Sequence, residues 1–166
     1  MPLDRSFAEV VVAAVRESAA ELEPWMPWAK PDYTLADAEA WLSGVEAGRA
    51  AGTVYEFAIV DDAGTFLGAA GINQGRLAEG VANLGYWVRS PEAGRGIAPR
   101  AVRLVVDWVF EHTALNRLEV LAAVANLRSR RVAVKSGAAF EAVLRKRFIL
   151  GGVPVDVALY AFVRPD

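Results

Sequence analysis

Apolar residues in the first part of the chain recur with the spacing of amphipathic helices. Between Asp4 and Leu22 they fall near one face of a helix, at Phe7, Val11, Ala14, Val15 and Leu22. The prolines of Pro24-Trp25-Met26-Pro27-Trp28 must end this helix, because proline cannot continue the hydrogen-bond ladder. Thr34 is placed to cap a second helix, which is predicted to run to about Gly48.

The pattern then changes to the alternation of apolar and polar residues that is typical of strands. Three strands are predicted in succession, Tyr55 to Val60, Phe66 to Asn73 and Val81 to Arg89. The turn Asp61-Asp62-Ala63-Gly64 joins the first two strands, and a glycine-containing loop from Ser90 to Arg95 follows the third.

Helical and strand patterns alternate in the second half of the chain. A long amphipathic helix is predicted after Arg95, with Ala101, Leu104, Val105, Trp108 and His112 as its buried stripe. A strand from Leu118 to Val124 is predicted next, followed by a helix that Asn126 caps and that ends near Gly137. The chain closes with a predicted hairpin of two strands, Phe140 to Leu150 and Val153 to Val163, which turns at Gly151-Gly152. An antiparallel meander, one strand–helix–strand crossover and a hairpin predict an α/β (α+β) three-layer fold.

Composition narrows the class of protein. The chain has 166 residues, 54% hydrophobic and 23% charged, which predicts a single globular domain over residues 1–166. No apolar run reaches the ~18–20 residues of a membrane span, and the start of the chain shows no secretion signal, so we expect a cytoplasmic protein. With no cysteine and one histidine, His112, thiolate nucleophiles and multi-histidine or cysteine metal sites are excluded, and we expect no metal.

Charge is divided along the chain. Residues 1–85 carry 13 acidic and 5 basic side chains, whereas residues 86–166 carry 13 basic and 7 acidic ones. The division favours one cationic and one anionic partner, although surface charge also drifts along chains by chance. Overall acidity, with no stripe of alternating aromatic and basic residues, argues against nucleic acid as the anion.

The candidate for chemistry is the junction from Leu84 to Ala98, where a strand leads through Gly94-Arg95-Gly96 into a helix. The first amides of a helix have no intrahelical partner, and the helix dipole favours negative charge beside them. Glycines without a Cβ allow a phosphate to approach the backbone. The pattern is neither a Walker loop nor the Rossmann fingerprint, so a structural loop and an anion site remain alternatives.

Several segments together carry a resemblance to a known family. Leu84 to Ala98 resembles motif A of the GNAT acyltransferases, and Asn126-Leu127-Arg128-Ser129 with Lys135-Ser136-Gly137 is similar to their next cofactor motif. Arg16-Glu17-Ser18, the tryptophan-rich turn, the segment 37–42 and Leu84-Gly85-Tyr86-Trp87 resemble the Rim-type acetyltransferases, which act on the N-termini of ribosomal proteins. The resemblance implies a central mixed, mostly antiparallel sheet that is splayed at the cofactor strand, with helices on both faces.

The sequence departs from the family pattern at three points. Ala93 stands where Gln or Arg is usual, and Asn83 stands where many relatives carry Glu as a general base. The family also opens with a strand before the first helix, whereas here the helix is predicted almost from Met1, so either that strand is absent or the sequence as given starts late. A missing edge strand would leave the backbone of its neighbour unpaired unless another chain covers it, so a homodimer is compatible with this sequence.

The resemblance implies acetyl-CoA as co-substrate and assigns residues to it. Its pantetheine arm would pair with the backbone near Trp87, Val88 and Arg89, with a backbone N–H near Val88 directed at the thioester oxygen. Its pyrophosphate would lie on the amides of Gly94, Arg95, Gly96, Ile97 and Ala98. Asn126 would hold the pantetheine arm, and a plain helix cap is an equally natural role for it.

Proton transfer has fewer candidates. Ser129 is implied as the acid that protonates the leaving thiolate, since Ala133 stands where other branches carry a tyrosine. Asn83 has no group that takes up a proton and can only orient a water molecule. Glu56 and Asp156 are the other candidates for the base, and they are strand carboxylates whose direction the sequence leaves open. His112 is expected to be structural, because it lies at the far end of its helix. Without cysteine, transfer must be direct, in a ternary complex.

The acceptor is expected to be an amine of low pKa. An α-amine of pKa ~8 is roughly 10% neutral at pH 7, whereas lysine at ~10.4 is well below 0.1%. Trp25, Trp28 and Trp41 are predicted to wall the acceptor site, although tryptophans are more often core residues. Acidic residues around the turn, Glu21, Glu23, Asp32, Asp37 and Glu39, would attract a cationic acceptor, and some of Arg128, Arg130, Arg131 and Lys135 would reach the 3′-phosphate of the cofactor.

Three functions remain open at this point. The leading one is an acetyl-CoA-dependent N-acetyltransferase acting on a protein N-terminal α-amine of the ribosomal-protein type. The second is an acetyltransferase of a small amine, such as an amino-acid conjugate or an antibiotic. The third is a non-catalytic acyl-CoA-binding module, which the departures at Asn83 and Ala93 motivate. None of the three calls for a nucleic acid or a membrane.

Overall fold

The computed structural model describes residues 1–165, without the side chains of Gln74 and Leu77. Helices and strands alternate along the chain as the sequence pattern predicted. The main elements are α1 (Ala8–Leu22), α2 (Leu35–Ala50), β1 (Tyr55–Val60), β2 (Phe66–Arg76), β3 (Val81–Val88), α3 (Ile97–His112), β4 (Arg117–Ala123), α4 (Leu127–Ser136), β5 (Ala139–Leu150) and β6 (Val153–Val163). Three short 3₁₀ turns, Arg5–Phe7, Leu77–Glu79 and Ser90–Glu92, precede α1, β3 and α3.

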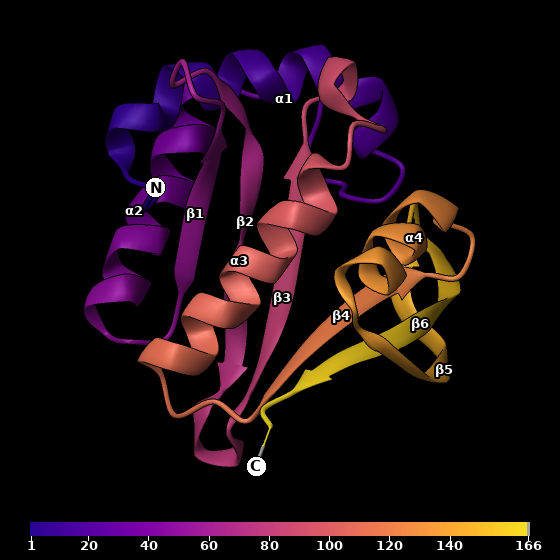
Figure 1. The fold of residues 1–166 in the computed structure, drawn as a ribbon. Helices are drawn as coiled ribbons and strands as arrows, with labels where there is room; N and C mark the ends of the chain where they lie inside the picture. Colours follow the sequence, from indigo (N-terminus) through magenta and orange to yellow (C-terminus); the bar gives the residue numbers. More distant parts are fainter. Residues whose placement is uncertain (166) are drawn as a thin grey trace.

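The six strands found within residues 1–165 form one mixed sheet with the order β1-β2-β3-β4-β6-β5. Every neighbouring pair is antiparallel except β3 and β4, which are parallel and are connected through α3. The predicted meander, crossover and hairpin are therefore confirmed. In Figure 1 the sheet divides into two halves, β1–β3 and β4–β6, which diverge from the end near the C-terminus.

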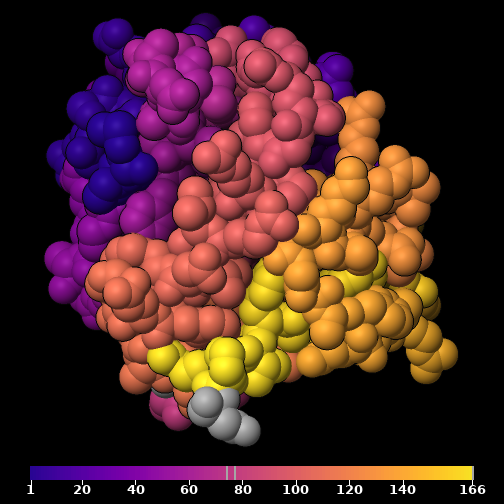
Figure 2. Space-filling view, in the orientation of Figure 1, coloured from indigo at the N-terminus to yellow at the C-terminus, as the bar shows by residue number. Residues whose placement is uncertain are grey.

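Helices cover both faces of the sheet and enclose two apolar cores. Helices α1 and α2 lie behind β1–β3 in Figure 1 and bury Val11, Val15 and Leu42 against Ala58 and Trp87 of the sheet. Helix α3 covers the opposite face, where its valines pack against Leu84, Leu118 and their neighbours. Figure 2 shows that side chains of α3 and α4 are in contact on the front face. This contact connects the two halves of the molecule on that side of the sheet.

Local signals account for the ends of several elements. Thr34 caps α2 in a capping box, since its hydroxyl accepts from the Asp37 N–H and the Asp37 carboxylate accepts from the Thr34 N–H. The β5–β6 hairpin turns at Gly151 and Gly152, whose φ angles of 55° and 78° favour glycine. The predicted boundaries hold to within a few residues.

The predicted buried stripe of α3 is wrong in part. Leu104 is 64% exposed, and His112 is also exposed. The buried side of the helix carries Pro99, Ala101, Val102, Val105, Val106 and Val109. The helix is rotated relative to the prediction because Trp108 packs at the flank of the stripe, with its ring 5.0 Å from those of Tyr55 and Phe57, and does not lie at its centre.

The first residues pair with β1, where the sequence predicted no strand before the first helix. The Ala58 N–H donates to the Met1 carbonyl at 2.8 Å, the Leu3 N–H donates to the Glu56 carbonyl at 3.0 Å, and Pro2 forms an isolated antiparallel bridge with Phe57. Leu3 is fully buried. Residues 1–3 therefore cover part of the β1 edge that the prediction left open.

Candidate active site

A gap opens in the sheet between β3 and β4. The two strands pair only from Val81↔Arg117 to Asn83↔Glu119, and beyond these pairs they separate. The Arg89 N–H donates to the Leu67 carbonyl of β2. Since successive residues of a strand point their N–H groups to opposite edges, the backbone of Tyr86 and Val88 faces the gap. The free edge of β3 thus offers donors and acceptors to an extended ligand.

The loop after β3 leaves a row of backbone amides without partners. Gly94 and Gly96 have φ angles of 81° and 78°, and a Cβ at either position would meet nothing within 4 Å. Gly96 is the N-cap of α3 and supplies no side-chain cap. Within residues 1–165, none of the N–H groups from Gly94 to Ala98 donates a hydrogen bond to the protein. Such amides at the positive end of a helix dipole form an anion site.

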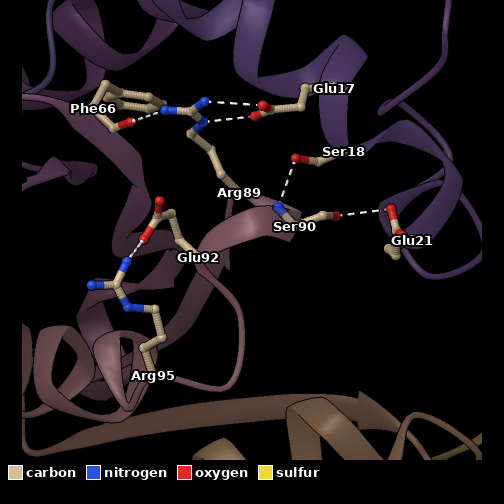
Figure 3. A network of polar contacts seen from close by, with 8 residues as sticks. All are labelled: Glu17, Ser18, Glu21, Phe66, Arg89, Ser90, Glu92 and Arg95. Atoms are coloured by element: carbon tan, nitrogen blue, oxygen red, sulfur yellow. Dashed lines mark hydrogen bonds and ion pairs between the residues drawn. The ribbon is translucent and has the colours of Figure 1, made fainter.

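Contacts with α1 hold the start of this loop in place (Figure 3). The buried Ser18 hydroxyl accepts from the Ser90 N–H at 2.9 Å, and the Ser90 hydroxyl donates to Glu21 at 2.8 Å. The Arg89 guanidinium donates to Glu17 at 2.7 and 3.1 Å, and this pairing lowers the pKa of the Glu17 carboxyl. The loop is therefore positioned before any ligand binds.

Arg89 is held by contacts within the protein. Its N–H is already bonded to Leu67, and its side chain is held by Glu17 and the Phe66 carbonyl. Arg89 therefore holds the loop against α1 and β2, and its predicted contact with a cofactor stays a prediction. Arg95 forms an ion pair with Glu92 beside the loop and is 67% exposed (Figure 3).

Two hydroxyl groups meet across the gap. The Tyr86 hydroxyl of β3 donates to the Ser129 carbonyl of α4 at 2.9 Å and lies 3.1 Å from the Ser129 Oγ. Burial raises the pKa of Tyr86 to about 12, so this hydroxyl stays protonated at neutral pH. The predicted acid candidate Ser129 thus has a partner that sequence reasoning missed, although Tyr86 stands within the motif that suggested the family.

Asn126 lies at the start of the same helix. Its side-chain oxygen accepts from the Ser129 N–H at 3.0 Å, which makes it the N-cap of α4. The structural role weighed for Asn126 is confirmed, and a role toward a pantetheine arm stays a prediction.

A cavity of about 890 Å³ lies on the α1/α2 side of β1–β3. Trp28 and Trp41 stack in its wall with ring centres 6.4 Å apart, and the Trp87 ring meets Trp28 edge-on at 6.2 Å. Tyr33 also lines it, 6.0 Å from Trp28. Of the three tryptophans predicted for an acceptor site, the structure brings two together here, whereas Trp25 does not line the cavity. The wall is suited to flat or apolar groups.

Charged groups also line this cavity. Among the acidic residues around the turn, Asp32 and Asp37 line it together with Lys30, whereas Glu21 bonds to Ser90. Glu23 and Glu39 do not line the cavity. The hydrogen bonds from Thr34 lower the pKa of the Asp37 carboxyl, which keeps its charge at neutral pH. The cavity therefore favours a cationic occupant.

The floor of the cavity carries a buried carboxyl group. Glu56 is 7% exposed, and its Oε1 accepts from the Asn73 side chain at 3.0 Å. The Asn73 oxygen in turn accepts from Asn83 at 3.0 Å. Burial raises the pKa of Glu56 to about 7, although the Asn73 hydrogen bond and the Arg49 charge act in the opposite direction. The open question of where Glu56 points is answered: it faces the cavity.

The remaining candidates lie elsewhere. The His112 ring stacks on Trp108 at 4.8 Å, and Asp156 accepts from the Lys146 N–H in the hairpin, so neither lines the cavity. Arg130 is held by Tyr160 and the Val124 carbonyl. Over residues 1–165 no helix is long and apolar enough to cross a membrane, and no group of three or more metal-ligating side chains lies together.

Comparison with known proteins identifies the family. A family model described as the acetyltransferase (GNAT) domain matches residues 2–139. The chain belongs to this family. The probable N-acetyltransferase YjcK of Bacillus subtilis is 39% identical over 86 residues, which cover 52% of this chain and 48% of YjcK. The ribosomal-protein-serine acetyltransferase of Escherichia coli is 30% identical over 81 residues, 49% of this chain and 45% of that protein. The matched segments thus span about half of these relatives.

A solved structure extends the likeness to the whole fold. RimJ of Mycobacterium smegmatis, in complex with a coenzyme A disulfide, superposes with a TM-score of 0.89 at 27% identity, covering 98% of this chain and 80% of that one. The GNAT resemblance and the splayed three-layer fold are confirmed, and ribosomal-protein acetyltransferases are among the proteins similar to this GNAT chain.

The described residues fit the co-substrate of this family, acetyl-CoA. The unpartnered amides from Gly94 to Ala98 match a diphosphate, and the open φ-positive glycines leave its approach free. The free β3 edge at Tyr86 and Val88 matches the amides of a pantetheine arm. The backbone N–H groups of Trp87 and Arg89 point toward β2, so Tyr86 and Val88 are the residues that face the gap. The predicted roles of Trp87, Val88 and Arg89 toward the arm stay predictions.

Proposed function

We propose that this protein is an N-acetyltransferase that moves the acetyl group of acetyl-CoA directly to the N-terminal α-amine of a protein. The observation that carries the proposal is the pair of sites on either side of β3: an amide cradle for a diphosphate and an aromatic, acidic cavity. Tyr86 lines the cavity and also reaches α4 across the gap, so one strand serves both sites.

The chain's own groups suit the steps of acyl transfer. Acetyl-CoA supplies an activated thioester, whose carbonyl oxygen gains negative charge when an amine attacks it. The Val88 N–H faces the gap and is the donor we assign to that oxygen; such a donor typically contributes ~10²–10³ in rate. Ser129, with Tyr86 beside it, is assigned to pass a proton to the departing thiolate.

The acceptor class rests on the cavity and on the relatives. Asp32 and Asp37 favour a cationic group, and the stacked Trp28 and Trp41 offer a surface for the first side chains of a peptide. The E. coli relative is named for acetylating a ribosomal protein. An acceptor of that class would place the reaction in the cytoplasm. A homodimer stays a prediction.

The proposal is tested by measuring thiol release from acetyl-CoA with three kinds of acceptor: peptides with a free α-amine, the same peptides with a blocked α-amine and a free lysine, and small amines. Mass spectrometry then locates the acetyl group. Release with the free α-amine peptides supports the proposal. Release with small amines alone would favour the second function, and coenzyme binding without turnover on any acceptor would favour a binding module.

The Ser129→Ala variant is expected to lower kcat by about 10²-fold, at the lower end of the range for acid–base groups, with little change in the KM for acetyl-CoA. Because Ser129 and Tyr86 lie in one hydrogen-bonded pair, a further Tyr86→Phe change should cost less than it does alone. Ser43→Ala, in α2, where the Ser43 hydroxyl accepts from Arg5, is the control and should keep the wild-type kcat. An unchanged kcat in Ser129→Ala would remove Ser129 from the mechanism.

A further inference from the structure

Glu56 combines burial, a fixed orientation and access to the acceptor cavity. It is the second residue of β1, opposite Gly71 of β2, which in turn is opposite Gly85 of β3. A Cβ at Gly71 would lie 2.5 Å from the Glu56 Oε2, whereas a Cβ at Gly85 would meet only the Asn73 and Asn83 side chains, at 3.6 and 3.9 Å. The two glycines therefore give the carboxyl group room to lie across the sheet and leave free volume beside it.

We infer that Glu56 is the general base of the transfer, taking a proton from the acceptor's ammonium group, and that Asn73 and Asn83 are positioning residues for its carboxylate. The inference rests on the proposed function, whose acceptor occupies the same cavity. The hydrogen bond from Asn73 to Oε1 leaves Oε2 without a side-chain donor among the described residues. Oε2 is the atom that we assign to the proton.

The other ionisable groups around the cavity are less suited to this step. Asp37 is engaged by Thr34 in the capping box, and its lowered pKa makes it a weak base. Tyr33 and Tyr86 have pKa values raised to about 12 and stay protonated. Lys30 carries a positive charge, and Asp32 is exposed to solvent at the rim.

Two cationic groups lie near β1, and one of them acts on Glu56. Arg49 of α2 donates to the Glu56 carbonyl at 2.5 Å, and its charge favours the carboxylate. The amino group of Met1 lies beside β1, where it donates to the Ala58 carbonyl at 3.2 Å. Since the Asn73 hydrogen bond and the Arg49 charge both lower the pKa of Glu56, burial is what holds it near 7.

The proton transfers balance with Glu56 in this role. The acceptor enters as R–NH₃⁺, and Glu56 takes one proton to leave R–NH₂ and a neutral carboxyl group, which later releases the proton to solvent. The amine nitrogen forms a bond to the thioester carbon as the carbon–sulfur bond breaks. The second nitrogen proton passes through the Ser129 hydroxyl to the thiolate. The products are the acetylated amine, coenzyme A as a thiol, and one proton.

The acidity of Glu56 also bears on the choice of amine. A carboxylate of pKa about 7 takes a proton from an α-ammonium of pKa ~8 at a tenfold disadvantage, which a fast following step overcomes. From a lysine ammonium of pKa ~10.4 the disadvantage exceeds 10³-fold. Glu56 thus favours α-amines over lysine side chains.

The test is Glu56→Gln, which keeps the shape of the side chain and the oxygen that accepts from Asn73. With a free α-amine peptide, kcat/KM at pH 7 is expected to fall by about 10²-fold or more. The fall in rate on the acid side of the wild-type profile, with an apparent pKa near 7, should be absent from the variant. The affinity for acetyl-CoA, measured by calorimetry, should be unchanged.

Thermal stability supplies a readout that needs no turnover. A carboxyl whose pKa is raised on folding stabilises the fold most below its unfolded pKa, and this contribution is lost as the pH rises to about 7. The Tm of the wild type should therefore fall relative to that of Glu56→Gln between pH 4.5 and 7. Asp156→Asn, the other strand carboxylate and outside the cavity, is the control that should change neither the rate nor this difference.

The outcomes separate the two proposals. If the wild type acetylates an α-amine and Glu56→Gln keeps both its rate within threefold and the acid limb of its profile, Glu56 is not the base. A lack of turnover by the wild type with every acceptor would overturn the proposed function, and this inference with it. Parallel pH dependence of Tm in the wild type and Glu56→Gln would also overturn the inference, since a carboxyl that titrates normally has no such role.

Discussion

A Gly96→Asp variant is expected to remain folded and to bind coenzyme A at least about 100-fold more weakly than the wild type. Gly96 is the N-cap of α3, and the amides from Gly94 to Ala98 have no acceptors within the described chain. A carboxylate introduced there would accept from those amides and would repel the diphosphate. Two like charges ~4 Å apart near a surface interact by about 4 kcal/mol, which exceeds a hundredfold change in affinity.

Gly96→Asp changes the charge at the anion site while the protein is expected to stay folded. Aspartate is among the few residues that tolerate a positive φ, and a Cβ at Gly96 meets open space. The left-handed backbone at Gly96 still strains any side chain, at a cost of about 1 kcal/mol, so the Tm should fall by a few degrees while the fold is kept. The measurement is titration calorimetry with coenzyme A, together with a thermal melt.

Gly96→Asn is the matched control because it has the same shape without the charge. We expect it to lose less than about tenfold in affinity. Equal losses in the two variants would mean that the side chain obstructs by its bulk. Wild-type affinity in both would show that the diphosphate binds elsewhere, and the central step of the proposed function would fail.

The second large effect is expected from Gly71→Ala. A Cβ at this position would lie 2.5 Å from both Cα and Oε2 of Glu56 and even closer to the Tyr55 carbonyl oxygen. Since two of these atoms belong to the backbone of β1, the strands must separate to make room. Such overpacking typically costs about 1–3 kcal/mol, which is roughly 3–10 °C in Tm for a domain of this size. Displacement of Glu56 should also remove most of the acetylation.

Gly85→Ala is the comparison for this effect. Its Cβ would meet the Asn73 side chain at 3.6 Å, an ordinary contact, so the Tm should stay near that of the wild type. Because Gly85 lines the cavity, the KM for a peptide acceptor is expected to rise while coenzyme affinity stays unchanged. Equal Tm values for Gly71→Ala and the wild type would contradict the close packing of β1 on β2.

The features that the sequence predicted correctly are short-range ones. Thr34 and Asn126 cap helices through bonds to residues three positions on, and Gly151-Gly152 turns a hairpin between adjacent strands. The left-handed glycines of the loop were likewise visible as a local pattern. These contacts depend on backbone geometry within a few residues, which neighbouring side chains determine by themselves.

Only the tertiary structure decided which side chains share a site. The Tyr86–Ser129 contact spans 43 positions and the Glu56–Asn73 contact 17, and both depend on strand register and on the gap between β3 and β4. A shift of one residue in register would turn Glu56 to the other face of the sheet. The rotation of α3 and the pairing of Arg89 with Glu17 are also set by packing between distant segments. The sequence by itself therefore determined the elements, the glycine loop after β3 and the family, because these are encoded locally. The cavity lined by Trp28 and Trp41 and its carboxyl group, Glu56, were decided by the tertiary structure, because burial and orientation depend on the assembled sheet.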